Sequence, residues 1–598
     1  MKKEIFYSQY FFWILISFLF LLMFIFKYPT IHFEPIEFGN IKSILHPDYP
    51  KGSITYDPHW HYDYIVAYYA KIFGVDIVDP FSGMSKIFWF LEQALTLIAL
   101  VKLCNFLFKD DRLTLVLVIF IYLALKSGES DQKTMLRPLH LFAIYYFLKE
   151  KWLLSAIFTA SISYLHIGFA IWWFVPSCFA IGIIFLMKDK QVTIIDITKY
   201  FFTAAFLASP ILYFYMGAEQ NIISSQFTTS FYYGVHNSIL LNLLYDPKAI
   251  TVLLITVGVF TMGYKKWKTT GGSNDYIVPI AFGVLILYII DFVLVDVMFN
   301  GAAIKLQLLR SKLNVELFAS LFFAFLIARQ LWNRNIVFFL ILLILLDPNP
   351  FWVFYPAIDR WIAFDVFYVV VIVYEIFEQQ ISVARAKVNL FVSNKSVLPQ
   401  FKKTTNWIQH FFQNPVNLAG FFVVLSALFV TMSLSPIKPY VKSVLGIQQK
   451  TGMSKRDSLN KDIARFTNEK IQGDDVILVT HFGEVDFEYY TNHKVFINVV
   501  KFLKPYTTGS EYDKMLSSNL RIIFENDLNY SIEKLRGGGS WDEMWKNVDE
   551  KLMRKWKKEY GITHVVRENE LPLDFPIAYE NEYYKVYDLR SLGNSQDA

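Results

Sequence analysis

Charged side chains are scarce in this sequence. They make up 18% of its 598 residues, whereas an ordinary soluble domain carries about 25%. Hydrophobic residues account for 54%, and they fall in blocks that short charged clusters separate. Such blocks are typical of a chain that crosses a bilayer several times as α-helices. The composition therefore predicts an α-helical polytopic membrane protein.

Cysteine is also rare, and the net charge is small. The two cysteines, Cys104 and Cys178, both lie in apolar blocks, so they indicate neither a disulfide framework nor a zinc site. The net charge is +5, and the basic residues sit in short loops. We interpret them as topology signals and expect no nucleic-acid partner. Because no small-residue cleavage site follows residues 1–26, we expect a retained first helix there.

The apolar blocks define the expected spans. A helix needs about 20 apolar residues to cross the hydrocarbon core. This criterion predicts roughly thirteen spans, several of them short. They are 10–26, 86–107, 112–125, 136–149, 152–166, 168–187, 199–217, 245–263, 276–297, 308–328, 336–347, 361–377 and 418–434.

Basic residues set the expected orientation. With Lys2 and Lys3 in the cytoplasm, nearly every later basic cluster falls in an alternate loop on the same side. These clusters begin at Lys109, Lys149, Lys188, Lys265, Arg329 and Arg385. Such asymmetry marks cytoplasmic loops. We therefore expect a multi-pass protein of the cell inner (plasma) membrane, with a cytoplasmic N-terminus and an extracytoplasmic C-terminal domain.

Two regions follow from the composition. Residues 1–436 form the expected membrane domain, with a long first outer loop at 27–85 and a basic inner loop at 378–417. Residues 437–598 form the expected extracytoplasmic α/β domain. Its predicted helices are Ser454–Ile471 and Trp541–Tyr560, the second ended by Gly561, and its predicted strands are Val476–Thr480, Lys494–Val499, Arg521–Phe524 and Ile562–Val566. Alternating helices and strands are typical of that fold class.

The first candidate site is the run Tyr56–Asp63, late in the first outer loop. It leads into a helix that we predict at Ile65–Phe73, ended by Gly74. Asp57 followed by Pro58 suits the N-cap and first position of that helix. A compatible interpretation makes the Asp57 carboxylate a base that faces the reaction centre.

The same run offers further ligands. His59 shares a helix face with Asp63, and Asp57 shares one with His61, at a spacing of four residues. Such pairs leave a metal site open as an alternative. Asp48 is another acidic candidate in this loop.

The second candidate site lies in the second outer loop. Glu129 and Asp131 have one residue between them, and Lys133 and Arg137 follow. Two such carboxylates can share a divalent cation such as Mg or Mn, although an ordinary solvated turn is the explanation that we favour. Arg137 stands at the mouth of a helix, where it can bind an anion or anchor the helix at the headgroups.

The third candidate site is a basic cluster at the outer start of a span, namely Lys305, Gln307, Arg310 and Lys312. Basic residues are expected on the other side, so a cluster here favours either a phosphate partner or lipid headgroups. Isolated residues receive a structural interpretation. These are His166 and Arg360, while Asp291, inside a span, is expected to face the bundle.

Together these motifs resemble the GT-C fold glycosyltransferase superfamily, which takes sugars from lipid-phosphate carriers. The run Tyr56–Tyr62 through Gly74 is similar to a stretch of the oligosaccharyltransferase catalytic subunit, whose second-loop acids correspond to Glu129 and Asp131. The resemblance covers the whole layout. The Trp-Trp-Asp motif of that subunit is absent here, so the resemblance does not extend to its peptide acceptor.

The resemblance implies a function. The donor would be a polyprenyl-phosphate-linked sugar, and the acceptor a glycan, lipid or protein, with inversion at the anomeric carbon. Asp57 would act as the base, His59 and His61 would contact substrate, and Arg137, Lys305 and Arg310 would stabilise the phosphate. A divalent metal on Asp57, Glu129 and Asp131 is implied by analogy.

Two other classes use similar lipids. A polysaccharide polymerase or ligase usually places its large outer loop between late spans, whereas the soluble domain here is terminal. A transporter or flippase is expected to show internal repeats and midplane charges, and the sequence shows no clear repeat. A scaffold that has lost catalysis is a fourth reading.

Overall fold

The structure is a computed structural model. It describes residues 60–75, 83–109, 111–125, 129–130, 132–187, 192–217, 247–298, 306–332, 465–471, 475–479 and 549–591, with short pieces at 16–45, 300, 303 and 462–463. The spans expected at 336–347, 361–377 and 418–434 lie outside these residues, as do the inner loop at 378–417 and the strands expected at 494–499 and 521–524.

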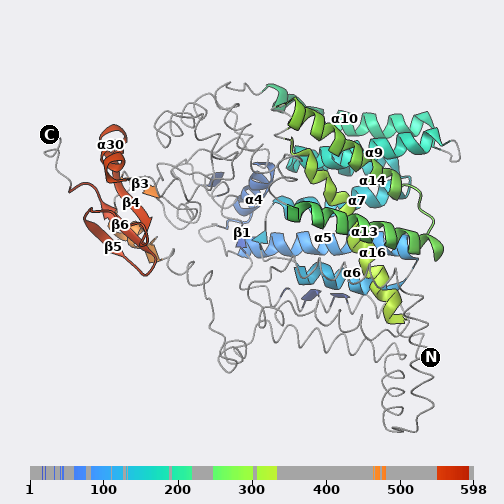
Figure 1. Cartoon of the computed structure of the whole chain (residues 1–598), viewed down its shortest axis with the longest axis horizontal. Coiled ribbons are helices and arrows are strands. Elements are labelled where there is room, and N and C mark those ends of the chain that lie inside the picture. Colours follow the sequence, from blue (N-terminus) through green and yellow to red (C-terminus); the bar gives the residue numbers. More distant parts are fainter. Residues whose placement is uncertain are drawn as a thin grey trace, which may run out of the picture.

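Long apolar helices form one block in which neighbouring helices run side by side (Figure 1). They are α5 (Gly83–Phe108), α6 (Arg112–Leu125), α7 (Gln132–Leu148), α8 (Trp152–Leu165), α9 (Ile167–Leu186), α10 (Ile194–Gly217), α13 (Pro247–Thr269), α14 (Ile277–Asp291) and α16 (Leu313–Trp332). Within the described residues, five helical segments are long and apolar enough to cross a membrane. The predicted multi-span helical architecture is thereby confirmed for this part of the chain.

Most helix bounds follow the apolar blocks, and the largest difference has a packing cause. The span predicted at 245–263 continues as α13 to Thr269. Trp267, beyond the predicted end, is buried, and its indole Nε1 donates a 2.9 Å hydrogen bond to the Leu107 carbonyl oxygen. The buried indole keeps the last turns of α13 against α5.

Three of the predicted inner loops meet at one end of the bundle, which we call the basic end: residues 107–112, 148–152 and 265–276. Four side-chain hydrogen bonds join them: Lys109 Nζ to Gly271 O (2.8 Å), Trp267 Nε1 to Leu107 O (2.9 Å), Asn274 Nδ2 to Leu148 O (3.1 Å) and Tyr276 OH to Glu150 Oε1 (3.1 Å). Basic loops that the sequence assigns to one side therefore lie together in the fold.

The opposite end of the bundle, which we call the site end, carries parts of the first two predicted outer loops. There β1 (His32–Phe33) pairs in parallel with β2 (Glu129–Ser130), and His32 lies opposite Glu129. Both strands contact α5. The pairing brings two loops together that are far apart in the sequence.

Helix α4 (Trp60–Ile72) lies in the predicted first outer loop and contacts α5 and α8. The predicted helix Ile65–Phe73 therefore starts too late. A fully buried stripe, Tyr62, Val66 and Ala70, recurs every four residues, and the Tyr62 hydroxyl donates to Glu92 Oε1 at 3.1 Å. This packing extends the helix toward its N-terminus. Gly74 follows its end with a positive φ of 62°, as the sequence predicts.

The C-terminal region holds a small mixed sheet of the order β3-β4-β6-β5. The strands are β3 (Val476–Val479), β4 (Ile562–Glu568), β5 (Ile577–Glu580) and β6 (Tyr584–Asp588). β3 and β4 are parallel, and the other pairs are antiparallel. The sequence predicts β3 and β4 but neither strand of the β5–β6 hairpin.

One helix, α30 (Glu550–Tyr560), is described beside this sheet. The predicted helix Trp541–Tyr560 is wrong at its start, because Asp549 is an extended N-cap whose side chain accepts a 2.9 Å hydrogen bond from the Leu552 N–H. Gly561 ends the helix with a φ of 69°, as predicted. Residues 465–470 are helical too, within the predicted helix Ser454–Ile471.

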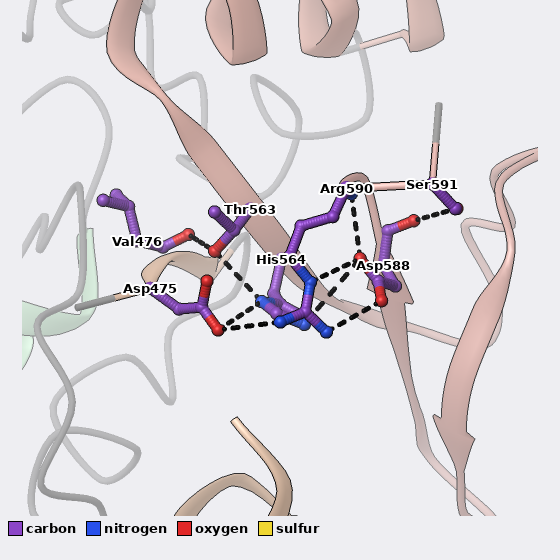
Figure 2. Close-up of polar contacts among 7 residues, drawn as sticks. All are labelled: Asp475, Val476, Thr563, His564, Asp588, Arg590 and Ser591. Carbon is purple, nitrogen blue, oxygen red and sulfur yellow. Dashed lines mark hydrogen bonds and ion pairs between the residues drawn. The ribbon is translucent and has the colours of Figure 1, made fainter. Parts of the chain in front are cut away.

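A charged cluster ties the end of β6 to the starts of β3 and β4 (Figure 2). The Arg590 guanidinium lies 3.1 Å from Asp475 Oδ2 and 2.9 Å from Asp588 Oδ2. Buried His564 lies between the two carboxylates, 3.9 Å from Asp475 Oδ2 and 4.0 Å from Asp588 Oδ1. The hydrogen bonds from Arg590 lower the pKa of Asp588. The cluster holds the three strands together by their ends.

Candidate functional site

A buried polar layer crosses the site end of the bundle. His140 Nε2 on α7 lies 2.8 Å from Asn314 Oδ1 in the first turn of α16. The Asn314 amide donates to the Trp172 carbonyl oxygen at 2.7 Å and to the Ser311 carbonyl oxygen at 3.0 Å. One asparagine therefore joins α7, α9 and the start of α16. Because Asn314 is buried, loss of these hydrogen bonds would leave its amide unpaired and destabilise the fold.

Trp172 of α9 connects this layer to a short 3-10 helix, η4 (Leu308–Lys312). Its indole Nε1 donates a 2.8 Å hydrogen bond to the Leu306 carbonyl oxygen. Gln307, which is buried, adopts the left-handed conformation with a φ of 50°, and η4 starts after it. The Arg310 guanidinium then lies over the Trp172 ring, 5.8 Å from its centroid. This arrangement favours the cation electrostatically and limits its orientation.

His166 has a structural role at the junction of α8 and α9. Its Nδ1 accepts a 3.1 Å hydrogen bond from the Phe169 N–H, which caps α9. Its ring centroid lies 5.4 Å from that of Trp172. A Cβ at Gly168 would lie 3.1 Å from His166 Cε1 and 3.5 Å from the Leu306 carbonyl oxygen. The structural interpretation of His166 agrees with these contacts.

Asp291 is the last residue of α14, and its side chain is fully buried. It faces the bundle, as the sequence predicts. Neither carboxylate oxygen has a hydrogen-bond partner. The helix continues after it as a π-helix, η3 (Phe292–Val297), a geometry that often occurs at functional positions.

The structure describes some of the predicted site residues and leaves others outside its described ranges. Asp48, Asp57, His59, Asp131, Lys305 and Arg360 lie outside the described residues. His61, Glu129 and Lys133 are described by backbone alone, in α4, β2 and α7. Their roles stay predictions.

Three predicted cations have described side chains. Arg137 is exposed on α7. Lys312 lies 3.2 Å from Glu316, in an ion pair on the start of α16. Of these three, Arg310 is the one whose described contacts place it beside the buried polar layer.

The metal site stays a prediction. Among the residues that the structure describes, no three His, Cys, Asp or Glu side chains are grouped so as to hold a metal ion. The predicted ligands Asp57, Glu129 and Asp131 have no described side chains, so no chemical step is assigned to Mg or Mn.

Sequence reasoning missed His140, Trp172 and Asn314. His140 and Asn314 are 174 residues apart, so no local spacing links them. The available signal was a polar side chain within or beside an apolar helix, which is a functional indication in a membrane protein.

No family model matches the chain, and no curated protein matches its sequence. Among solved structures, it is similar to ArnT from Cupriavidus metallidurans, whose crystal structure is bound to undecaprenyl phosphate. The two are 11% identical, with a TM-score of 0.48 over 98% of this chain and 100% of that one.

Proposed function

We propose that the chain is a membrane glycosyltransferase that moves a sugar from a polyprenyl-phosphate-linked donor to an acceptor at the non-cytoplasmic face. The observation that carries this proposal is the position of Arg310, beside a buried polar layer at the end opposite the basic loops. Basic side chains are disfavoured on the non-cytoplasmic side. A cation that is nevertheless oriented there by an indole is suited to a phosphate.

The two acid-bearing loops are joined at the same end. The β1–β2 pair links the first outer loop to the second at Glu129. Asp57 lies three residues before the first residue of α4, and Asp131 directly precedes α7. This linkage supports a site that combines carboxylates from both loops with the cation on η4.

The chemistry follows from these residue types. The acceptor hydroxyl attacks the anomeric carbon, the bond from that carbon to the phosphate oxygen breaks, and the lipid phosphate leaves with the electron pair. Asp57 takes the hydroxyl proton. Arg310, with Lys305 and Arg137, offsets the charge that develops on the phosphate. A single displacement inverts the anomeric centre, and the anionic leaving group requires no general acid.

The test uses the full chain in lipid nanodiscs, with a panel of undecaprenyl-phosphate-linked radiolabelled sugars and a membrane glycolipid extract as acceptor. We expect release of undecaprenyl phosphate and transfer of label. Asp57→Asn should abolish transfer, and Arg310→Ala should lower kcat/KM by about a hundredfold because transition-state charge loses its partner. Lys312→Gln is the matched control, since it removes a cation from the same short helix that pairs with Glu316 instead.

Other outcomes separate the competing classes. Intact donor that appears in the opposite leaflet of a liposome would indicate a flippase. Label that accumulates as a lengthening glycan would indicate a polymerase. Full transfer by Asp57→Asn would remove the assigned base, and an unchanged donor with the wild-type chain would refute the proposed function.

A further inference from the structure

The buried carboxylate of Asp291 has no role in the chemistry described above. Its side chain has 0% exposure, and neither oxygen accepts a hydrogen bond. A carboxyl group offers about four hydrogen-bonding positions, and leaving a polar group unbonded inside an apolar bundle is unfavourable. We therefore expect the hydrogen-bond partner of Asp291 to be a group on a bound ligand.

The packing of α14 shows which level of the bundle Asp291 occupies. Its buried face, Ile280, Val284, Leu287 and Asp291, recurs at helical spacing. On this helix Gly283 lies against the backbone of Pro176 on α9, because a Cβ there would be 2.7 Å from Pro176 Cα. Asp291 stands eight residues further along, which is about 12 Å.

The site end lies at that level. α9 runs antiparallel to α14. Tyr276, just before α14, bonds Glu150 at the basic end, whereas Trp172, in the first turns of α9, bonds Leu306 at the site end. Moving about 12 Å back from Pro176 along α9 reaches its first residues, near Gly168. A Cβ at Gly168 would be 3.5 Å from the Leu306 carbonyl oxygen, and α14 packs against η4 as well. Asp291 is therefore level with the chain that carries Arg310.

The electrostatic surroundings exclude some partners. Asp291 lies close enough to Asp296 to interact with it, and Tyr288 interacts with both Asp291 and Glu316. Glu316 is paired with Lys312, but the like charges of Asp291 and Asp296 disfavour a phosphate placed directly on Asp291. The described residues also lack a metal-binding group there. Neutral hydrogen-bond donors suit the site, and the donor lipid has them in its sugar hydroxyls.

We propose that Asp291 binds hydroxyl groups of the donor sugar, while Arg310 binds the adjoining phosphate. A second buried polar atom at the site end, Ser311 Oγ, also has no hydrogen-bond partner. Because it would bind the sugar hydroxyls, Asp291 would determine which sugar is accepted. This inference rests on the proposed function and adds the sugar-recognising group to it.

The first experiment compares two lipids. Binding of undecaprenyl phosphate and of an undecaprenyl-phosphate-linked hexose is measured on the full chain in nanodiscs. The wild type should prefer the hexose-bearing lipid, and Asp291→Asn should reduce that preference about tenfold, because the amide keeps the size of the side chain but replaces one carboxyl oxygen. Affinity for the bare lipid should not fall. Asp275→Asn is the matched control, because it makes the same substitution just before the other end of α14, where Asp275 pairs with Lys268, and it should keep the preference.

The second experiment remains informative if Asp291→Asn assembles poorly. Donors that each lack one sugar hydroxyl are tested with the wild type and with Asp291→Ser, in a double-mutant cycle. Removal of the hydroxyl that Asp291 binds should lower kcat/KM in the wild type and have no further effect in the variant.

The results separate the two proposals. If the wild type transfers sugar and every deoxy donor loses the same factor in wild type and variant, Asp291 does not bind the sugar and the glycosyltransferase assignment stands. Equal loss of affinity for both lipids in Asp291→Asn also overturns the inference. If the wild type releases no lipid phosphate from any donor, the proposed function fails and this inference fails with it.

Discussion

The Trp172 indole N–H donates a 2.8 Å hydrogen bond to the Leu306 carbonyl oxygen. The same ring lies under the Arg310 guanidinium, at 5.8 Å. One side chain of α9 therefore positions both the chain that enters η4 and the cation that η4 carries. The two contacts use different parts of the indole, so substitutions can separate them.

Replacement of Trp172 should weaken phosphate binding in two steps. Trp172→Phe keeps an aromatic face and loses the N–H, whereas Trp172→Leu loses both. We expect a few-fold loss of affinity for undecaprenyl phosphate in the first and at least about tenfold in the second, from contributions of about 1 kcal/mol each. The control is Trp267→Phe, which loses an equivalent bond to Leu107 at the basic end. If Trp267→Phe weakened lipid binding as much as Trp172→Phe, the effect would reflect general stability.

A methyl group at Gly283 should separate α14 from α9. The added Cβ would lie 2.7 Å from Pro176 Cα and 2.8 Å from the Pro176 carbonyl oxygen, and backbone atoms cannot rotate away. Gly283→Ala should destabilise the bundle by about 1–3 kcal/mol, seen as a lower Tm in detergent. Gly182→Ala is the control on α9, since no atom lies within 4 Å of its added Cβ. Equal Tm values for the two variants would contradict the packing described here.

Loss of Arg590 should loosen the C-terminal sheet. Arg590→Met leaves Asp475 and Asp588 without their guanidinium partner. Because Arg590 is partly exposed, we expect a modest effect of about 1 kcal/mol. Amide hydrogen exchange of β4 and β6 in the full chain should become about fivefold faster at pH 7. Unchanged exchange would show that the strands are held without the cluster.

Low pH should also loosen the C-terminal sheet of the wild-type chain. The pKa of Asp588 is lowered by its hydrogen bonds to Arg590, so the ionised form stabilises the folded state. That contribution is complete above the ordinary aspartate pKa of about 3.9 and is lost as the pH falls through the lower folded value. Pepsin should therefore cut the wild-type sheet faster as the pH drops below about 4. Arg590→Met should depend less on pH over this interval, and equal dependence would contradict the assignment.

Cysteine labelling tests which membrane face the site end occupies. In a chain with Cys104 and Cys178 replaced, Tyr68→Cys reports the exposed face of α4, and Thr270→Cys reports the basic end. An impermeant maleimide should label position 68 in intact cells and position 270 after permeabilisation only. The reverse pattern would place the candidate site in the cytoplasm and remove the glycosyltransferase proposal.

Local patterns predict much of this fold. The apolar run of α6 gives both of its bounds, and Gly561 ends α30 as its conformational freedom predicts. Hydropathy cannot place Trp267 inside the bundle, because burial of that indole depends on α5. The β5–β6 hairpin was missed for a similar reason. Tyr584 and Val586 are buried by partners across the sheet. The turn between the two strands contains neither Asn-Gly nor Asp-Gly, which are the strongest hairpin signals.

The candidate site was less predictable than the fold. Arg310 stood out because its charge opposes the topology rule. Asn314 did not, since its importance comes from three partners on α7, α9 and η4. Contacts between distant segments are set by how helices pack, and a single sequence carries no direct record of them.

The hydrogen bonds of the basic end also constrain how the bundle can open. They tie α5 to α13 and the α7–α8 turn to the chain before α14, through side chains that reach across neighbouring helices. Because these bonds join neighbouring helices at one end, we expect relative movement of the helices to be larger at the site end. Under the proposed function, this predicts that the tail of the donor lipid lies between helices near η4, away from the hydrogen-bonded basic end.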